Sequence, residues 1–507
     1  MDAWVTQIGT GEFHNLTEGG APELLNSEVR SVGFTPDGSL VTLWTRGADR
    51  SNDVNVWAAP TMGGALREYR PGAVELDWTS DGGRLVFHIA AEGDPIFVVD
   101  SNDSTPRQIH VAPRGVHNHF LTWDPDDKHI YFVRGRPPDE MDIWRMTADG
   151  ENLQRITHHN TRVLYPTFLD ERTLLYLATQ EDGSGPWLYA IEVERGASRR
   201  ISFGVEQYTS LAASADGRRL VATVEHAKAS LWRVPITDQT AEESDASRIA
   251  DTTVGAISPR AGPDFLAYVA AKRDGHSIWR LTDGTATELW SASGMRVIGG
   301  PSIAPDGTSI AFCAEGADGA HLYVADVDGS STRIVSGALE VRGSPAWSPD
   351  GRTITVAVNQ GGEPQLFNLS VDTHEASPLN TGYAINPQWS PDGAFLIYAE
   401  ADAGPSFALK GMDATGADYL LPEIKLPRGA RRVAFVPGRR ALIVLEGQMR
   451  HNQFWYIDLE TGSRRQLTNF GREFTIRDFD ISTDGREIIF DRRHDNSDLA
   501  LIELSGK

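Results

Sequence analysis

Two histidines separated by one residue are the strongest metal-ligating pair in the chain. His117 and His119 flank Asn118, and side chains two apart on a strand point to the same face. The two imidazoles could therefore share a metal or a ligand. No carboxylate or third histidine stands at a matching place in the sequence. We therefore predict no metal, with polar loop histidines as the simpler interpretation.

Other catalytic patterns are missing from the sequence. It contains no Gly-x-Ser-x-Gly elbow, and no room for a hydrolase domain follows the last repeat. Gly9–Phe13 resembles a glycine-rich loop, but none of the other protein-kinase motifs follows it. Asp326–Ser330 imitates the start of a calcium loop without the bidentate Glu that such a loop needs. We expect hairpin turns at both places.

A short phrase recurs about every 44 residues and predicts the architecture. Its best copies, Trp347–Gly351 and Trp389–Gly393, each read aromatic, Ser, Pro, Asp, Gly. Counting the Asp or the residue in its place, the series runs 37, 81, 126, 170, 216, 264, 306, 350, 392, 438, 484. Pro presets the turn, Asp bonds a following amide, and Gly supplies the positive φ, so each Asp is expected to be a turn residue. Eleven copies at this period indicate a propeller or solenoid.

Each repeat contains the strands of one propeller blade. In the eighth, apolar strands are expected at 344–347, 353–358 and 365–369. Four strands in about 44 residues match one blade, which must stack on its neighbours to bury its faces. We predict an all-β chain of about eleven four-stranded blades. Two unequal tandem propellers of five and six blades, with hybrid blades at the seam, are favoured over one large closed ring.

The boundary between the two propellers is expected near residue 250. The spacer 237–247 is the most polar stretch of the chain, and the repeat after it is the most eroded. This gives an N-terminal propeller at 1–250 and a C-terminal propeller at 251–507. An ordinary surface hairpin that grew longer is the alternative, with 1–507 as a single propeller.

The repeat also resembles a known family. The Trp-Ser-Pro-Asp-Gly phrase, an aromatic strand such as Ile278–Leu281 and an ending such as Arg465–Thr468 resemble the PD40 (TolB-like, WD40-like) β-propeller repeat over essentially the whole chain. The run from Asp2–Val5 and Phe13–Thr17 onward is most similar to the C-terminal propeller regions of bacterial serine/threonine kinases and winged-helix transcriptional regulators. The resemblance implies a propeller and carries no catalytic residues.

Aligning the repeats isolates a column of candidate ligand-binding residues. The position seven residues before the turn Asp should lie at the channel mouth, and it holds Arg30, Val74, His119, Val163, Thr209, Ile257, Gly299, Gly343, Ile385, Arg431 and Arg477. Arg162, Arg296, Arg342 and Arg432 lie nearby with a small offset. A single closed ring would make Arg30, Arg431 and Arg477 neighbours, and such a basic rim suits an anionic ligand or an acidic peptide. The predicted ligand-binding residues are Arg30, His119, Arg431, Arg477, Arg162 and Arg342. Alternatively, these arginines pair with carboxylates such as Glu28, Glu340 and Asp478.

Composition narrows the partners and the compartment. The formal net charge of −23 argues against binding to nucleic acid, which needs clustered Lys and Arg. The single Cys313 excludes an intrachain disulfide, and its apolar setting predicts a buried thiol. No signal peptide or 18-residue apolar run is present. We expect a cytoplasmic chain with no membrane contact of its own and no cofactor, or a periplasmic one if it is part of a longer, membrane-anchored protein.

These observations favour a binding protein over an enzyme. We predict a non-catalytic β-propeller that binds a protein or an anionic small molecule, as the sensory or scaffold module of a bacterial regulatory protein. The alternative is a carbohydrate-active lyase or hydrolase that uses His117, His119 and the rim arginines, since polysaccharide lyases on related propellers use histidine clusters. A third alternative is a propeller that regulates access to a catalytic domain outside this chain.

Overall fold

The computed structural model describes most of the chain. The described residues are 2–21, 32–46, 54–101, 105–137, 140–179, 186–202, 207–225, 228–250, 252–253, 255–272, 275–316, 318–360, 363–380, 382–401, 406–427, 433–448, 451–471, 473–494 and 497–504. They form β-strands almost throughout, and their one helical segment is the short 3-10 turn Glu243–Asp245. The all-β prediction is confirmed.

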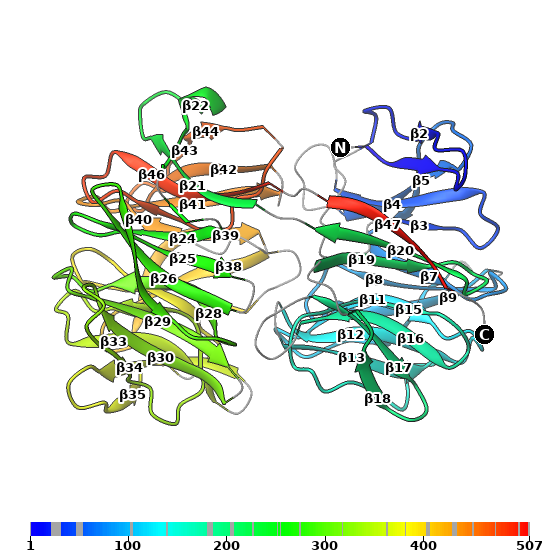
Figure 1. Ribbon diagram of the computed structural model, residues 1–507, viewed down its shortest axis with the longest axis horizontal. Helices are drawn as coiled ribbons and strands as arrows, with labels where there is room; N and C mark the ends of the chain where they lie inside the picture. The colour runs from blue at the N-terminus through cyan, green and yellow to red at the C-terminus, as the bar shows by residue number, and fades with distance from the viewer. Residues whose placement is uncertain are drawn as a thin grey trace.

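The first group of sheets, here the N-terminal group, contains five blades and a small hairpin (Figure 1). The hairpin and the first two blades are β1 (Trp4–Thr6) with β2 (Phe13–Asn15); β3 (Val32–Phe34), β4 (Leu40–Arg46), β5 (Val54–Pro60) and β6 (Arg67–Pro71); and β7 (Ala73–Trp78), β8 (Arg84–Ile89), β9 (Ile96–Asp100) and β10 (Arg107–His110). The other three are β11 (His117–Trp123), β12 (His129–Arg136), β13 (Glu140–Thr147) and β14 (Gln154–Arg155); β15 (Val163–Phe168), β16 (Thr173–Ala178), β17 (Trp187–Glu192) and β18 (Ala197–Arg200); and β19 (Gln207–Ala213), β20 (Arg219–Glu225) and β47 (Ser497–Glu503).

The second group, here the C-terminal group, contains six blades. The first three are β24 (Ala256–Ala261), β25 (Leu266–Lys272), β26 (Gly275–Thr282) and β27 (Thr285–Ser291); β28 (Arg296–Ile303), β29 (Ser309–Gly316), β30 (Gly319–Asp326) and β31 (Thr332–Ile334); and β32 (Val341–Trp347), β33 (Thr353–Gln360), β34 (Glu363–Ser370) and β35 (Ala376–Pro378). The others are β36 (Ile385–Trp389), β37 (Leu396–Ala399), β38 (Ser406–Met412) and β39 (Asp418–Pro427); β40 (Val433–Phe435), β41 (Ala441–Gln448), β42 (His451–Asp458) and β43 (Arg464–Gln466); and β45 (Phe479–Ile481) and β46 (Glu487–His494) with β21 (Lys228–Pro235) and β23 (Ser247–Arg248). A short parallel pair, β22 (Ala241–Glu242) and β44 (Thr468–Asn469), lies beside them.

The chain crosses between the groups twice, and each group is completed by a strand from the other half of the sequence. β21 pairs with β46 in the C-terminal group, and β47 pairs with β20 in the N-terminal group. In Figure 1 the red strand β47 accordingly lies beside the green strand β20, away from β46. As a division into domains, the boundary near residue 250 stays a prediction. In the pairing of strands, however, 228–248 join the C-terminal sheets and 497–503 join the N-terminal ones, so both segments depart from that division.

The hydrophobic core lies between blades, as the repeat grammar predicted. In one cluster, Val86 and Ile96 of one sheet pack with Leu121, Trp123 and Phe132 of the next. Cys313 is buried, as its apolar setting predicted. A blade alone would leave these faces in water, so the stacking of neighbours stabilises each of them.

The repeated aspartates are turn residues. Asp350 accepts hydrogen bonds from the Ser348 hydroxyl at 2.6 Å and from the Arg352 amide at 3.1 Å. These two bonds lower the pKa of Asp350, with the nearby charge of Arg352 adding to their effect. The same arrangement recurs at Asp392 and Asp484. Local turn chemistry therefore explains the conspicuous repeat aspartates.

Most first strands carry a bulge at one place, and the bulge positions the candidate site. The register shifts in β7, β11, β15, β19, β24, β28, β32 and β36. Ser258 and Asn386 adopt positive φ of 49° and 54° there, and Gly299 and Gly343 adopt 71° and 65°. Such a bulge re-aims side chains and leaves amides outside the ladder. Both effects act where the first strands of neighbouring blades meet.

Candidate functional site

A pocket of about 250 Å³ lies among the first strands of the C-terminal group. Its polar lining comes from five of the six blades: Arg260 on β24, Ser302 on β28, Ser344 on β32, Asn386 and Gln388 on β36, and Asp480 on β45. Phe407, Leu409 and Val433 supply much of the apolar lining. Convergence of single polar side chains from several blades on a partly apolar hollow is typical of a binding site.

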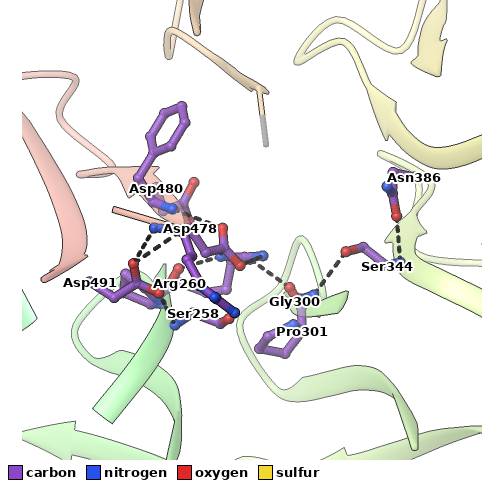
Figure 2. A network of polar contacts seen from close by, with 12 residues as sticks. Ser258, Arg260, Gly300, Pro301, Ser344, Asn386, Asp478, Asp480 and Asp491 are labelled. Atoms are coloured by element: carbon purple, nitrogen blue, oxygen red, sulfur yellow. Dashed lines mark hydrogen bonds and ion pairs between the residues drawn. The ribbon is translucent and has the colours of Figure 1, made fainter. Parts of the chain in front are cut away.

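Hydrogen bonds between neighbouring blades hold this lining in place (Figure 2). The Asn386 Oδ1 atom accepts the Ser344 amide at 2.9 Å, and the Ser344 hydroxyl accepts the Gly300 amide at 2.8 Å. Asp480 Oδ2 accepts the Ala261 amide at 3.0 Å. The Gly300 and Ser344 amides lie in bulges, and the Ala261 amide directly follows the bulge of β24. In each case a side chain of the next blade supplies the partner that the ladder does not. Buried amides need such partners.

Arg260 joins three blades through one buried guanidinium. Its Nη1 and Nη2 atoms donate to Asp478 Oδ1 at 3.0 Å and Oδ2 at 2.9 Å, and its Nε donates to the Pro301 carbonyl at 2.7 Å. The Arg260 side chain is only 3% exposed. A two-pronged pair of this kind fixes geometry as well as charge. Arg260 therefore forms a rigid wall of the pocket.

A second carboxylate behind this pair is unusual in its pKa. Asp491 accepts the amides of Arg477, Asp478 and Ser258 at 2.7, 3.0 and 3.2 Å. Burial and the negative charge of Asp478 raise its pKa to about 6, although the three amides favour the ionised form. The protonation of Asp491 thus changes within a physiological range of pH.

The pocket presents hydrogen-bond acceptors. Asp480 brings a carboxylate to the lining, and Gln388 brings its side-chain amide. The Gln388 Oε1 atom is buried and has no hydrogen-bond partner in the described part of the chain. An unmet buried acceptor is costly, so a ligand that supplies an N–H or O–H here would be stabilised.

Of the three arginines predicted to form the basic rim, the structure describes Arg477. Arg30 and Arg431 lie outside the described residues. Arg477 precedes β45 in the C-terminal group, whereas the blade that follows Arg30 belongs to the N-terminal group. The proposed cluster depends on a single closed ring, whereas the described strands pair into two groups of sheets. Ligand binding by these arginines stays a prediction.

Two of the other predicted arginines are held by contacts in the protein. Arg342, at the start of β32, forms ion pairs with Glu340 at 3.2 Å and with Glu140 on β13 of the other group. Arg114 and Glu400 form a second contact between the groups, at 3.9 Å. Arg162, just before β15, is half-buried, and its amide donates to the Thr179 hydroxyl. The alternative that rim arginines pair with carboxylates therefore describes Arg342.

The pocket residues occupy positions slightly later than the column chosen from the sequence. Ser344 and Asn386 stand six residues before the turn Asp, and Arg260, Gln388 and Asp480 stand four before it. The bulge turns these positions inward. A signal existed in the sequence, because polar and charged residues interrupt otherwise apolar first strands at these two columns.

His119 needs a correction of a different kind. The rings of His117 and His119 are stacked at 5.9 Å, as their spacing predicted. The sequence suggested that no carboxylate or third histidine accompanies them, and this was wrong. Two sets, Glu75, His88, His119 and Asp94, His117, His119, each bring their ligand atoms within 4.8 Å of one another. The new members come from the neighbouring blade, too far away along the chain for spacing to indicate them.

Comparison with known proteins supports the repeat family. The family model described as "TolB beta propeller domain" (PD40) matches residues 233–423. The Tol-Pal system protein TolB of Alcanivorax borkumensis is 37% identical over 79 residues, which are 15% of this chain and 18% of that protein. TolB of Anaeromyxobacter dehalogenans strain 2CP-1 is 33% identical over 111 residues, or 22% of this chain and 25% of that protein. The matched part is thus a quarter or less of these relatives.

One solved structure also aligns with about half of this chain. The putative TolB from Agrobacterium tumefaciens aligns with 53% of this chain and 99% of its own, at 14% identity and a TM-score of 0.41. Within the described ranges, no helix has the length and apolar character needed to cross a membrane. The family model and the TolB relatives together support a PD40, TolB-type β-propeller.

Proposed function

We propose that this chain is a non-catalytic binding propeller that receives a donor group of a partner protein in the pocket of its C-terminal group. The supporting observation is the buried Oε1 atom of Gln388, which has no partner among the described residues and belongs to a side chain that lines the same pocket as the Asp480 carboxylate. The TolB relatives carry the name Tol-Pal system protein, which is compatible with a scaffold role.

The size and charge of the pocket select the ligand. Small-molecule pockets usually exceed about 300 Å³, and this one is about 250 Å³. It suits one or two side chains better than a whole metabolite. Asp480 lines it, and the guanidinium of Arg260 is neutralised by Asp478. A Lys or Arg side chain of the partner supplies both the donors and the positive charge that this lining accepts.

The remaining predictions on context stay proposals. A role as the sensory or scaffold module of a bacterial regulatory protein is compatible with a binding propeller. The similarity to kinase and winged-helix regulator propellers is part of the same proposal, as is binding of an anionic ligand by the rim arginines. A periplasmic location is proposed ahead of a cytoplasmic one. The lyase or hydrolase alternative retains the histidine cluster as its one structural observation.

Selection of peptides tests the proposal. A phage-displayed library of random peptides is panned on the wild-type protein, and the selected peptides are titrated calorimetrically. We expect Lys- or Arg-containing peptides whose affinity falls about tenfold for Asp480→Asn, which removes one charge-assisted bond. Asparagine retains an oxygen that can accept the Ala261 amide.

A matched control makes the result specific. Asp264→Asn removes one exposed negative charge from the same group, outside the pocket lining, and should leave the affinity unchanged. Gln388→Leu should weaken binding without altering the charge. Selection of acidic peptides, or equal affinities for wild type, Asp480→Asn and Gln388→Leu, would contradict the proposal.

A further inference from the structure

Three histidines and two carboxylates form a buried cluster in the N-terminal group. We propose that Glu75, His88 and His119 hold a divalent transition-metal ion between the second and third blades. Glu75 lies on β7, His88 on β8 and His119 on β11. One ligand atom from each residue lies within 4.8 Å of the other two. Two imidazoles and one carboxylate form a recurrent ligand set for zinc and for non-haem iron.

The spacing of the ligand atoms suits a metal better than a hydrogen bond. His88 Nε2 lies 3.6 Å from Glu75 Oε2, which is long for a hydrogen bond. Ligands about 2.1 Å from a tetrahedral ion stand about 3.4 Å from one another. A metal between these two atoms therefore needs only small movements. By contrast, His117 Nδ1 lies 2.7 Å from Asp94 Oδ2, which is an ordinary hydrogen bond.

Buried polar atoms around the cluster point to an additional ligand. The side chain of His88 is 1% exposed, and neither ring nitrogen has a hydrogen-bond partner among the residues that the structure describes. The Oδ1 atom of buried Asn118 is likewise unpaired within those residues. Buried polar groups are normally satisfied, so unpaired nitrogens next to a carboxylate call for a cation or water between them.

Charge favours the cation. Glu75 and Asp94 are both almost fully buried and lie close to the same imidazole. Two buried carboxylates need positive charge close by, because an uncompensated buried charge is strongly unfavourable. A divalent ion neutralises both. Calcium and magnesium prefer oxygen ligands, whereas the imidazole nitrogens here favour zinc and similar transition metals.

Hydrogen bonds from neighbouring groups hold the proposed ligand side chains in place, as they do in known metal sites. The Phe120 amide donates to Glu75 Oε2, in the bulge that gives Phe120 a φ of 56°. Asp94 Oδ2 accepts the Asn118 amide at 3.3 Å, holds the ring of His117, and lies 3.9 Å from His119 Nε2. The bulges of β7 and β11 thus position the cluster in the same way as the bulges that form the C-terminal pocket. Of the three proposed ligands, His119 is the most exposed, at 12%.

Metal titration of the untagged, full-length protein tests this site. After EDTA treatment and exchange into metal-free buffer, Co²⁺ and Zn²⁺ are titrated, with stoichiometry read by mass spectrometry of the metal content and by calorimetry. We expect one tightly bound ion per chain and a visible Co²⁺ d–d spectrum of a four- or five-coordinate site. Absence of one stoichiometric ion in the wild type would overturn the proposal, whatever the variants do.

Substitutions locate the ion. His88→Gln and Glu75→Gln should each lower the Zn²⁺ affinity at least about 100-fold, with circular dichroism checking the fold. His110→Gln, a partly buried histidine of the second blade outside the cluster, is the matched control and should bind as the wild type does. An unchanged affinity in folded His88→Gln would refute the assignment. Because peptide binding occurs in the other group, failure of one proposal leaves the other testable.

Discussion

A single role recurs for the polar side chains of the first strands. Glu75, Ser344, Asn386 and Asp480 each accept an amide from a neighbouring blade. These bonds explain why a propeller can place carboxylates and amides near its centre without losing stability. Some buried polar atoms near these bonds, such as Gln388 Oε1, have no partner among the described residues. Such atoms remain available to a ligand, and they distinguish the two proposed sites from purely structural contacts.

The raised pKa of Asp491 predicts a pH dependence of stability. The folded carboxyl has a pKa of about 6, against a reference value of 3.8. It therefore holds its proton at a pH where the unfolded carboxyl has lost it, and the free energy of unfolding falls as pH rises from about 4 to about 6. The full effect is roughly 3 kcal/mol.

The Asp491→Asn variant isolates this contribution. Urea unfolding at pH 4.5, 5.5, 6.5 and 7.5 should show the wild type losing stability relative to the variant until about pH 6, with a constant difference above it. Parallel pH curves for the two proteins would show that Asp491 does not titrate in this window.

The Arg260–Asp478 pair predicts strong coupling between two distant segments of sequence. Arg260→Met leaves a buried carboxylate unpaired, and we expect a loss of about 3–5 kcal/mol in the free energy of unfolding. Arg260→Met combined with Asp478→Asn should recover part of that loss, because no unpaired charge remains. A double-mutant cycle in urea measures the coupling, and additive single effects would contradict the role given to the pair.

Among the strands of each blade, the bulged first strand positions the residues of both proposed sites. Gly343 has a φ of 65°, and a Cβ there would overlap Asn386 Oδ1 and lie 2.9 Å from Ile385 Cγ1. Gly337 has a similar φ of 57° with no atom near its Cβ position. A comparison of the two positions therefore separates the cost of a left-handed backbone from the cost of a steric clash.

This contrast gives the next prediction. Gly337→Ala should cost about 1–2 kcal/mol for its left-handed backbone alone. Gly343→Ala should cost at least about 1 kcal/mol more, because it also displaces Asn386, and it should weaken peptide binding. Urea unfolding and calorimetry measure both effects. Equal losses for the two variants would indicate that the bulge tolerates a side chain.

The bulge also explains which parts of the fold and of the candidate sites could be predicted from the sequence. The Asp350 turn and the common face of His117 and His119 followed from contacts within a few residues, which spacing encodes directly. The pocket column was missed because one left-handed residue per strand, such as Asn386 or Ser258, shifts the inward face. Glu75 and His88 could not be assigned to His119, because only the packing of one blade on the next brings them together. Local chemistry was predictable, whereas contacts between blades required the structure.

For the whole molecule, the exchange of strands links the two groups. β47 closes the last N-terminal sheet after the chain has completed the C-terminal one. The Arg342–Glu140 and Arg114–Glu400 pairs add contacts between the groups. β47 covers the edge that β20 would otherwise present, so the stability of the N-terminal group depends on a strand that follows the whole C-terminal group in the sequence.

Adjacent residues on β47 test this dependence. Ile502 packs against the core cluster of the N-terminal group, and its neighbour Leu501 is 44% exposed on the other face. Ile502→Asp buries an unpaired charge and should detach β47, so hydrogen exchange should accelerate in β20 and in the adjoining blade while β28–β35 remain protected. Leu501→Asp should leave both groups as in the wild type. Equal acceleration in both groups would mean that they unfold as one unit, and equal behaviour of the two variants would mean that β47 does not stabilise the N-terminal group. The expected result, loss of protection in the N-terminal group alone, would establish that β47 stabilises that group and not the C-terminal one.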